Sequence, residues 1–471
     1  MPDFATEPSI IQGGMGAAVS DWRLANAVAL TGQLGVVSGT GIDTVFVRRL
    51  QDGDSGGHLR RAMERFPIPG VVENALRRYY RPAGKGVGEP YRLVPLLRNV
   101  VSPARQQLTM LATYAEVFLA KEGHDAPVGI NLLTKIQMPT LPTLYGAMMA
   151  GVGYVLMGAG IPREIPGALD QLALHQPARI RFDVEGAGRN EARYLDFDPQ
   201  IHWAAVPVPL KRPKFFPIIS SNLLATVLAR KANGRVDGFI IEGPTAGGHN
   251  APPRGDAANN ERGEPVYGER DIVDLEQIRA LGLPFWVAGG AGHPERLAAA
   301  REAGAAGIQV GTLFAFCDES GLAEPLKRSV LACAGRGEVS VRTDPRASPT
   351  GYPFKVVSWP GMSTLQAKRE RKCELGYLRT PFVTASGRID FRCPAEPADA
   401  YVRKGGKIED TVGRSCLCNG LLSVIGHAQV NADGSVEQPI LTSGDDLLTI
   451  SGFLAGRSAY SAADVVDYLT S

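Results

Sequence analysis

The chain of 471 residues lacks the features that mark membrane proteins and nucleic-acid-binding proteins. No window reaches the ~18 uninterrupted apolar residues that a membrane-spanning helix needs. Its 50 Lys and Arg nearly balance its 48 Asp and Glu, and no long basic run occurs. Residues 1–8 lack the basic start and apolar core of a signal peptide. We therefore expect a cytoplasmic protein that binds neither membranes nor nucleic acid.

The sequence also lacks a Gly-x-Gly-x-x-Gly fingerprint and has only six cysteines. Without that fingerprint a Rossmann dinucleotide-binding domain is disfavoured. In a reducing compartment the cysteines are not expected to form structural disulfides. Glycine, in contrast, is abundant. It accounts for 55 of the 471 residues, which is well above the ~7% of an average protein. Most of these glycines end apolar runs, a pattern typical of tight turns between strands and helices.

Eight short apolar runs with intervening helical segments predict the fold. The runs begin near residues 9, 35, 128, 153, 215, 236, 285 and 306. Strands that alternate with helices indicate a parallel α/β sheet. Eight such units over about 320 residues favour a (β/α)8 TIM barrel with insertions. Periodicity alone leaves a doubly wound open sheet as the alternative.

Two insertions and a tail depart from the alternation. Residues 43–125 predict a helical insertion without a clear strand, and residues 177–211 predict a polar excursion rich in hairpins. We expect residues 1–335 to form the barrel with both insertions. Residues 336–471 would be a C-terminal extension, either an appended domain or a flap over the barrel mouth.

The stretch from Val236 to Asn250 has the strongest functional pattern. An apolar strand passes abruptly into Glu-Gly-Pro-Thr-Ala-Gly-Gly-His. Ligands of parallel sheets bind at the carboxyl ends of strands, where His249 would lie. Gly247 and Gly248 have no Cβ, so the backbone there can approach a flat or charged ligand. A catalytic histidine is therefore indicated, although a glycine turn with a surface histidine would give the same pattern.

Glycine-rich loops after the seventh and eighth strands suggest a phosphate site. These loops are Ala288-Gly-Gly-Ala-Gly292 and Gln309-Val-Gly-Thr312. Barrels often hold a phosphate between these two loops, using backbone N–H groups and a helix N-terminus. The sequence therefore predicts a cofactor that carries a phosphate.

Four motifs together resemble the nitronate monooxygenase (2-nitropropane dioxygenase) family of FMN-dependent TIM barrels. They are Ile11-Gln-Gly-Gly-Met-Gly16, Glu242 to His249, Ala288-Gly-Gly-Ala291 and Gln309 to Thr312. The resemblance implies that His249 is catalytic and lies near the flavin N5 atom. It also implies that a further set of residues binds FMN: Gly14, Met15, Asn131, Glu242, Gly247, Gly248, Gly289, Gly290, Gln309, Gly311 and Thr312. Glu242 departs from the family, which commonly has Gln at that position.

The resemblance implies an FMN-dependent oxidoreductase that acts on a small molecule. The expected reaction is the oxidation of alkyl nitronates by oxygen to a carbonyl compound and nitrite. Related proteins are enoyl reductases of fatty acid and polyunsaturated fatty acid synthesis, so an NAD(P)H-dependent enoyl-thioester reductase is the alternative. A non-catalytic flavin- or metal-binding scaffold is a third hypothesis. A homo-oligomer is possible for each of them.

Four cysteines, Cys373, Cys393, Cys416 and Cys418, cluster in the tail. Four thiolates are enough for zinc or an iron–sulfur cluster. The segment lacks the long apolar strands of the barrel and so has little core of its own, and small segments of that kind usually need a staple. We therefore predict one metal site from these four residues. The alternative is that they are ordinary small buried side chains, as we expect for Cys317 and Cys333.

Overall fold

Eight parallel strands form the centre of the molecule in the computed structural model, which describes residues 7–188, 191–255, 258–362 and 370–471. The order of the strands is β1-β10-β9-β8-β7-β4-β3-β2. Their bounds are β1 (Ile10–Gln12), β2 (Gly35–Ser38), β3 (Val128–Leu133), β4 (Tyr154–Gly158), β7 (Lys214–Ile219), β8 (Phe239–Glu242), β9 (Phe285–Ala288) and β10 (Gly307–Val310). Each strand begins within three residues of its expected position.

The sheet closes on itself between β1 and the residue that precedes β2. Leu34 forms a parallel bridge with Ile11. The Gln12 amide donates to the Leu34 carbonyl at 2.9 Å, and the Leu34 amide donates to the Ile10 carbonyl at 3.1 Å. The Gln12 side chain then accepts the Val36 N–H at 2.9 Å, which takes the place of a further ladder bond. This closure confirms the TIM barrel and excludes the open sheet.

Large apolar side chains fill the inside of the barrel. Trp286 and Phe216 are fully buried there, and their ring centroids are 4.8 Å apart. The Trp286 indole donates to the Pro8 carbonyl at 2.7 Å, so the segment before β1 covers one end of the barrel. Because this end is filled, a ligand can enter only from the opposite end, where the strands finish.

Helices surround the barrel and connect its strands. The connecting helices are α1 (Trp22–Leu30), α5 (Pro103–Ala120), α6 (Thr140–Met149), α7 (Ile165–Ala173), α8 (Asn222–Lys231), α9 (Leu275–Arg279), α10 (Pro294–Glu302), α11 (Thr312–Ala315) and α12 (Glu324–Gly335). Short 3-10 turns lie at η2 (Pro199–His202) and η3 (Glu269–Asp271). Ser221 caps α8 by accepting the Leu224 N–H at 3.0 Å.

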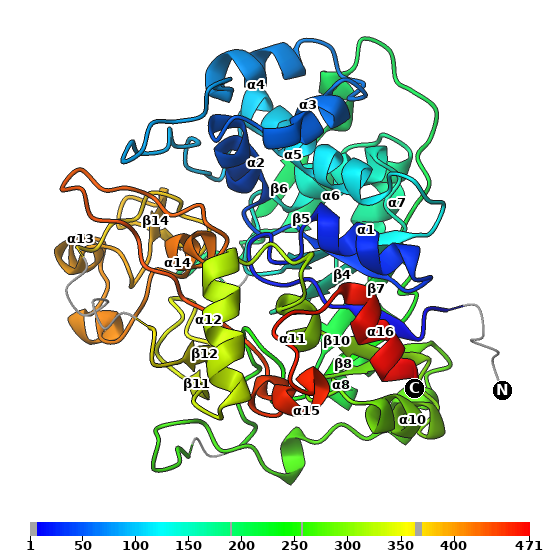
Figure 1. Ribbon diagram of the computed structural model, residues 1–471. Coiled ribbons are helices and arrows are strands. Elements are labelled where there is room, and N and C mark those ends of the chain that lie inside the picture. Colours follow the sequence, from blue (N-terminus) through cyan, green and yellow to red (C-terminus); the bar gives the residue numbers. More distant parts are fainter. Residues whose placement is uncertain (1–6, 189–190, 256–257, 363–369) are drawn as a thin grey trace.

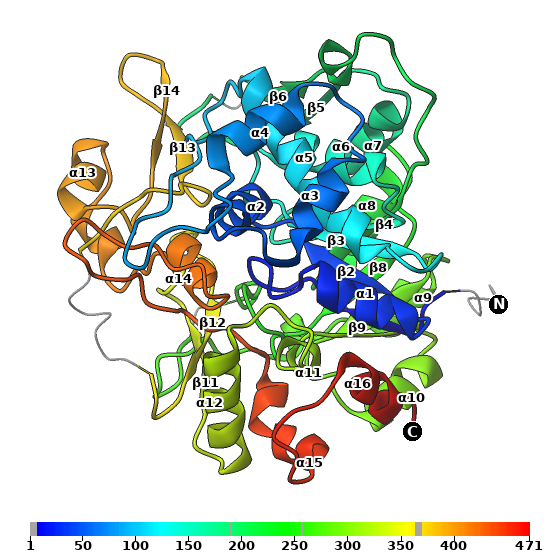
Figure 2. The same ribbon diagram turned by 45° about the horizontal axis from the view of Figure 1, so that its top comes forward.

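Both predicted insertions have the expected secondary structure. Residues 43–125, all of which the structure describes, contain helices and no strand: most of α2 (Ile42–Gln51), then η1 (Ser55–Gly57), α3 (His58–Met63), α4 (Val71–Tyr79) and α5. These helices lie together at the top of Figure 1 and Figure 2. The second insertion forms an antiparallel hairpin of β5 (Ala178–Arg181) and β6 (Tyr194–Phe197).

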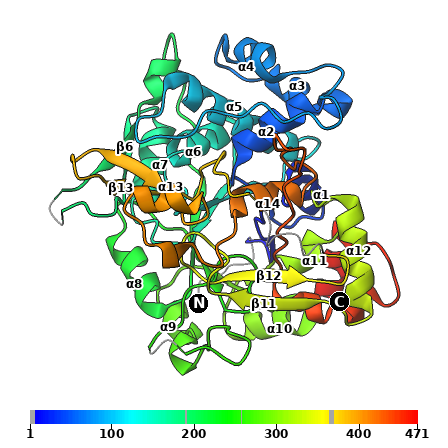
Figure 3. The same cartoon turned by 90° about the vertical axis from the view of Figure 1, so that its left-hand side faces the viewer.

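The tail lies across the open end of the barrel, as Figure 3 shows. Its elements are β11 (Ser340–Asp344), β12 (Phe354–Ser358), β13 (Thr380–Val383), β14 (Ile389–Arg392), α13 (Ala398–Arg403), η5 (Ile408–Thr411), α14 (Leu417–Ser423), η6 (Asp445–Leu448), α15 (Ile450–Leu454) and α16 (Ala462–Thr470). Strand β12 lies beside the loop that follows β8, and the Lys355 N–H donates to the Gly248 carbonyl at 2.9 Å. The two antiparallel hairpins were not predicted, since their strands are too short and too polar to stand out.

The tail shares its core with the barrel. Leu375, Tyr377, Leu417 and Leu422 are buried in one apolar cluster together with barrel residues. The tail therefore does not depend on a core of its own, because its apolar side chains are buried against the barrel. The position of a domain boundary near residue 335 stays a prediction.

The tail also contacts the helical insertion through buried polar side chains. Asp43 of α2 forms an ion pair with Arg105 of α5 at 2.5 Å and accepts a hydrogen bond from the Tyr377 hydroxyl. The same hydroxyl lies 2.6 Å from Thr44 Oγ1. Burial alone would raise the pKa of Asp43, but Arg105 and these hydrogen bonds lower it overall. The network therefore holds one ionised carboxylate between the insertion and the tail.

Candidate active site

One cavity of about 220 Å³ lies at the carboxyl ends of the barrel strands. All of the predicted catalytic and cofactor-binding residues line it: Gly14, Met15, Asn131, Glu242, Gly247, Gly248, His249, Gly289, Gly290, Gln309, Gly311 and Thr312. Glu242 is the last residue of β8, and Gly289 follows β9 directly. Parallel strands therefore bring residues that are far apart in the sequence to one place. Their individual roles stay predictions.

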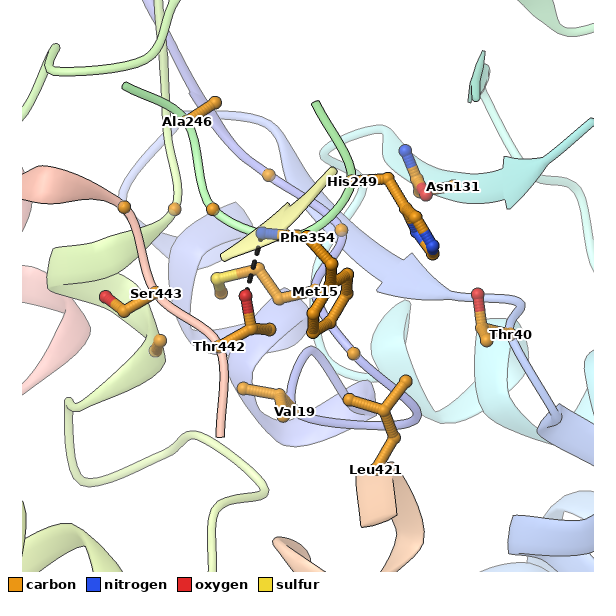
Figure 4. A pocket seen from close by; sticks show the side chains of 18 of the residues that line it. Met15, Val19, Thr40, Asn131, Ala246, His249, Phe354, Leu421, Thr442 and Ser443 are labelled. Carbon is orange, nitrogen blue, oxygen red and sulfur yellow. Dashed lines mark hydrogen bonds between the residues drawn. The ribbon is translucent and has the colours of Figure 1, made fainter. Parts of the chain in front are cut away.

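The tail supplies part of the cavity wall, and the sequence did not indicate which of its residues do so. Tail residues on the wall are Phe354, Tyr377, Leu378, Cys418, Leu421, Leu422, Val424, Ile440, Leu441, Thr442, Ser443, Gly444 and Asp446. Figure 4 shows Thr442 and Ser443 on one side of the cavity, with His249 and Asn131 on the other. The Gly248 N–H donates to Thr442 Oγ1 at 2.8 Å. No motif marks these tail residues, because folding alone brings them to the barrel.

Two of the predicted glycines are needed for contacts within the protein. A Cβ on Gly14 would lie 2.2 Å from the Cβ of Asn131, and one on Gly247 would lie 2.7 Å from the Ser443 carbonyl carbon. Neither position can hold a larger residue unless the neighbouring segment moves. The reason for Gly247 therefore differs from our prediction, since the close neighbour of its backbone is the tail.

His249 is held by residues of the tail. Its Nε2 atom lies 2.6 Å from Ser348 Oγ, and Ser348 Oγ lies 2.8 Å from Thr350 Oγ1. Phe354 contacts the imidazole ring edge-on, with the ring centroids 4.9 Å apart. Burial lowers the pKa of His249 to about 4, and the positive charge of Lys135 contributes in the same direction. The imidazole is therefore neutral at pH 7, and the alternative of a histidine on a surface turn is wrong.

Glu242 is an acid that the protein keeps largely protonated. Burial raises its pKa to about 8, above the value of 4.5 that is usual for this side chain. At pH 7 most Glu242 side chains are therefore neutral and have an O–H to donate. Glu242 in place of the family's usual glutamine therefore changes the charge of the site little at pH 7, since both side chains offer a neutral donor and an acceptor.

Asp446 of the tail forms a hydrogen bond with one backbone N–H group of the predicted phosphate site. Its carboxylate accepts the Gly292 N–H at 3.1 Å, just before α10. Thr312 Oγ1 accepts the Gly444 N–H at 3.0 Å on the neighbouring loop. Burial raises the pKa of Asp446. The donors left for a phosphate are therefore the backbone groups around Gly289 and Gly311.

The polar wall of the cavity has groups that suit a flavin. Gln309 Oε1 is buried and has no hydrogen-bond partner among the described residues, although buried polar atoms are normally paired. A flat ring with its own N–H donor would satisfy this atom, and Met15 and Phe354 give apolar wall area. Gln309 and the neighbouring glycines would hold FMN, which supplies the electron transfer when bound.

The structure does not show the predicted metal site. The four tail cysteines all line one small cavity of about 10 Å³. However, no group of three or more His, Cys, Asp or Glu side chains in the described parts of the chain has the arrangement to hold a metal ion. Burial of the tail against the barrel also stabilises it without a metal.

No helix among the described residues has the length and apolar character to span a membrane.

Comparison with known proteins finds similarity in one part of the barrel. Residues 207–344 match the family model named "Nitronate monooxygenase". This part of the chain is therefore similar to the nitronate monooxygenase family. A nitronate monooxygenase of Pseudomonas aeruginosa is 38% identical over 157 residues, which are 33% of this chain and 38% of that protein. A probable nitronate monooxygenase of Staphylococcus haemolyticus is 31% identical over 124 residues, 26% of this chain and 33% of that protein.

Each of these relatives aligns with this chain over only part of its own length. The aligned residues span a third or slightly more of the length of each relative. Among solved structures, the enoyl reductase domain of MlnA from Bacillus amyloliquefaciens is 12% identical, with a TM-score of 0.49. That alignment covers 99% of this chain and 94% of the MlnA domain.

Proposed function

We propose that this protein is an FMN-dependent oxidoreductase that oxidises alkyl nitronates to a carbonyl compound and nitrite with oxygen. The observation that carries this proposal is a neutral, fixed His249 in the cavity that gathers all four family motifs. The similarity of residues 207–344 to the nitronate monooxygenase family supports the flavin, and the unpaired Gln309 oxygen supports a ring-shaped cofactor with an N–H donor.

The charges around the cavity suit an anionic substrate such as a nitronate. Lys135 is close enough to His249 to lower the pKa of the imidazole, so it adds positive potential at this end of the cavity. Glu242 is mainly protonated at pH 7 and therefore does not repel an anion. Its O–H can donate a hydrogen bond to a nitronate oxygen.

His249 would orient the substrate and accept a proton. The Ser348 hydroxyl fixes the orientation of the imidazole, which preorganises its second nitrogen for a partner in the cavity. A neutral imidazole is a general base, whereas a protonated one is not. The low pKa of His249 therefore keeps the base available throughout the neutral range.

A second cavity favours an enoyl-thioester reductase as the alternative function. This cavity of about 310 Å³ shares Glu242 and His249 with the first and extends past Ser220, Arg254 and Tyr267. A small nitronate does not need a second chamber, but a long thioester does. In this reaction NAD(P)H would be the electron donor, and Glu242 would be placed to donate a proton.

Anaerobic stopped-flow reduction of the bound flavin tests these alternatives. Propyl nitronate should bleach the flavin absorbance rapidly, while NADH and NADPH should do so slowly or not at all. Rapid bleaching by a pyridine nucleotide, followed by reoxidation with crotonyl-coenzyme A, would establish the reductase instead. If none of the three reductants bleaches the flavin, the protein is a non-catalytic scaffold.

The cofactor itself is tested by reconstitution. We expect the apoprotein to bind FMN in preference to FAD, because the strand-end loops fit a monophosphate and the chain has no adenylate fingerprint. Gln309→Leu should weaken FMN binding measured by fluorescence quenching. Gln438→Leu, which changes a half-buried glutamine of the tail outside this cavity, is the matched control. Equal affinities for FMN and FAD would contradict the assignment.

A further inference from the structure

A small cavity in the tail brings four thiols together beside the candidate active site. Its volume is about 10 Å³, and Cys373, Cys393, Cys416 and Cys418 all line it. All six cysteines of the chain are free thiols. Cys418 and Leu378 line both this cavity and the candidate active site, so the thiol cluster lies against the wall of the larger cavity.

The β13–β14 hairpin explains why Cys373 and Cys393 meet. Thr380 at the start of β13 pairs with Arg392 at the end of β14. Cys393 follows Arg392 directly, and Cys373 lies on the segment that leads into β13. The hairpin therefore brings Cys393, just after its second strand, back to Cys373, just before its first strand. The two thiols form a hydrogen bond with each other.

The two thiols of this pair differ in reactivity. Cys373 is partly exposed, whereas Cys393 is buried with 6% of its surface exposed. The hydrogen bond from Cys393 lowers the pKa of Cys373, and the positive charge of Arg379 adds to this effect against the opposing effect of burial. The same hydrogen bond and burial raise the pKa of Cys393. Cys373 is thus the nucleophile, and Cys393 keeps its proton.

The Arg379 guanidinium is fixed where it can favour a thiolate. It donates to the Leu97 carbonyl at 2.7 Å and to the Gly376 carbonyl at 3.2 Å, and it stacks on Phe391 with 4.9 Å to the ring centroid. Arg379 also lines the thiol cavity. A guanidinium held in place by carbonyls keeps its full positive charge, which stabilises an anionic sulfur nearby.

We propose that Cys373 and Cys393 are a peroxide-reactive pair that forms a disulfide, with Cys373 as the attacking thiol and Cys393 as the resolving thiol. The Cys373 thiolate attacks one oxygen of hydrogen peroxide, the O–O bond breaks, and the hydroxide that leaves takes a proton to become water. The resulting sulfenic acid is then attacked by the Cys393 sulfur. The S–O bond breaks, the S–S bond forms, and the Cys393 proton leaves with the hydroxyl group as a second water. Two thiols are oxidised and one peroxide is reduced.

Peptide mapping of the full-length protein tests the proposal. The reduced protein is titrated with hydrogen peroxide, the remaining thiols are alkylated with N-ethylmaleimide, and the digest is read by mass spectrometry. We expect a cross-linked peptide that joins Cys373 to Cys393 to appear before Cys317, Cys333, Cys416 or Cys418 loses its alkylation. In Cys393→Ser, dimedone should trap the sulfenic acid on Cys373.

Two variants and the wild type keep the test decisive. Cys333→Ser changes a buried cysteine outside the cluster and should leave the cross-link unchanged. Cys373→Ser should abolish the cross-link without a dimedone adduct on Cys393. The wild-type titration does not depend on the folding of any variant. The proposal is overturned if Cys373 and Cys393 stay alkylated while other thiols oxidise, or if the first disulfide joins a different pair.

Discussion

His249 of the barrel and Ser348 of the tail are 2.6 Å apart, from Nε2 to Oγ. The two residues are 99 positions apart in the chain, and this contact joins the candidate base to a segment outside the family motifs. The orientation of the imidazole therefore depends on the tail. A barrel without the tail would retain the histidine but lose the group that fixes it.

Ser348→Ala is expected to lower kcat/KM by about 2- to 10-fold, which is the loss of one hydrogen bond of about 0.5–1.5 kcal/mol. FMN content should not change, because Ser348 does not line the flavin cavity. His249→Ala should cost roughly 10²–10⁴ in kcat/KM, as for a lost general base. The double variant should match His249→Ala alone, since Ser348 acts only through the histidine.

Steady-state kinetics with the exposed Ser386→Ala variant as control would measure these effects. A Ser348→Ala effect that persists in full in the His249→Ala background would show that Ser348 acts in another way.

Lys135→Met should shift the acid limb of the pH profile to higher pH. Burial and Lys135 together lower the pKa of His249 to about 4, so removing the positive charge raises that pKa toward its usual value of 6.5. The base is active when neutral, so activity is lost as pH falls through this pKa. The profile of kcat/KM against pH measures the shift, and Lys231→Met on the exposed end of α8 is the control. Identical acid limbs in both variants and the wild type would contradict the role of Lys135.

Glu242→Gln should make the apoprotein more stable than the wild type at pH 8 and above. The pKa of Glu242 is about 8 when folded and near 4.5 when unfolded. The folded protein therefore binds the extra proton between these values, and its stability falls as pH rises from about 4.5 to 8. The variant has no proton to lose there. The difference in Tm between variant and wild type should grow across this range and level off above it.

Chemical unfolding at several pH values gives the same comparison as free energies. Glu276→Gln changes an exposed glutamate of α9 and should show no such trend. A constant difference between Glu242→Gln and wild type from pH 5 to 9 would mean that Glu242 has an ordinary pKa.

Arg105→Met should destabilise the protein by about 3–5 kcal/mol, because it leaves Asp43 buried without its cation. Asp43 is 1% exposed and lies 2.5 Å from the Arg105 guanidinium. Asp43→Asn combined with Arg105→Met should cost less than Arg105→Met alone. Urea unfolding measures both. Arg328→Met, which breaks an exposed pair with Glu324, should cost about 1 kcal/mol or less. A similar small effect for Arg105→Met would contradict the importance of the buried pair.

The sequence by itself determined the barrel and the residues at its strand ends. Apolar runs such as the one that ends at Glu242 are local patterns, and a parallel barrel places every strand end on one face. Because the local pattern and the barrel topology agree at the strand ends, the sequence alone could predict that Gln309 and His249 lie in one site. The first insertion was readable for the same reason, since helical periodicity is local.

Only the tertiary structure decided what the tail does. Ser348, Thr442 and Asp446 have no local signature. Thr442 and Asp446 line the cavity, and Ser348 contacts His249, only because folding brings partners together that are far apart in the chain. The four cysteines show the same limit: their spacing suggested a metal site, but which sulfurs face each other depends on the β13–β14 hairpin. The ionisation of Glu242 and His249 also follows from burial, a property of the folded chain that no residue pattern records.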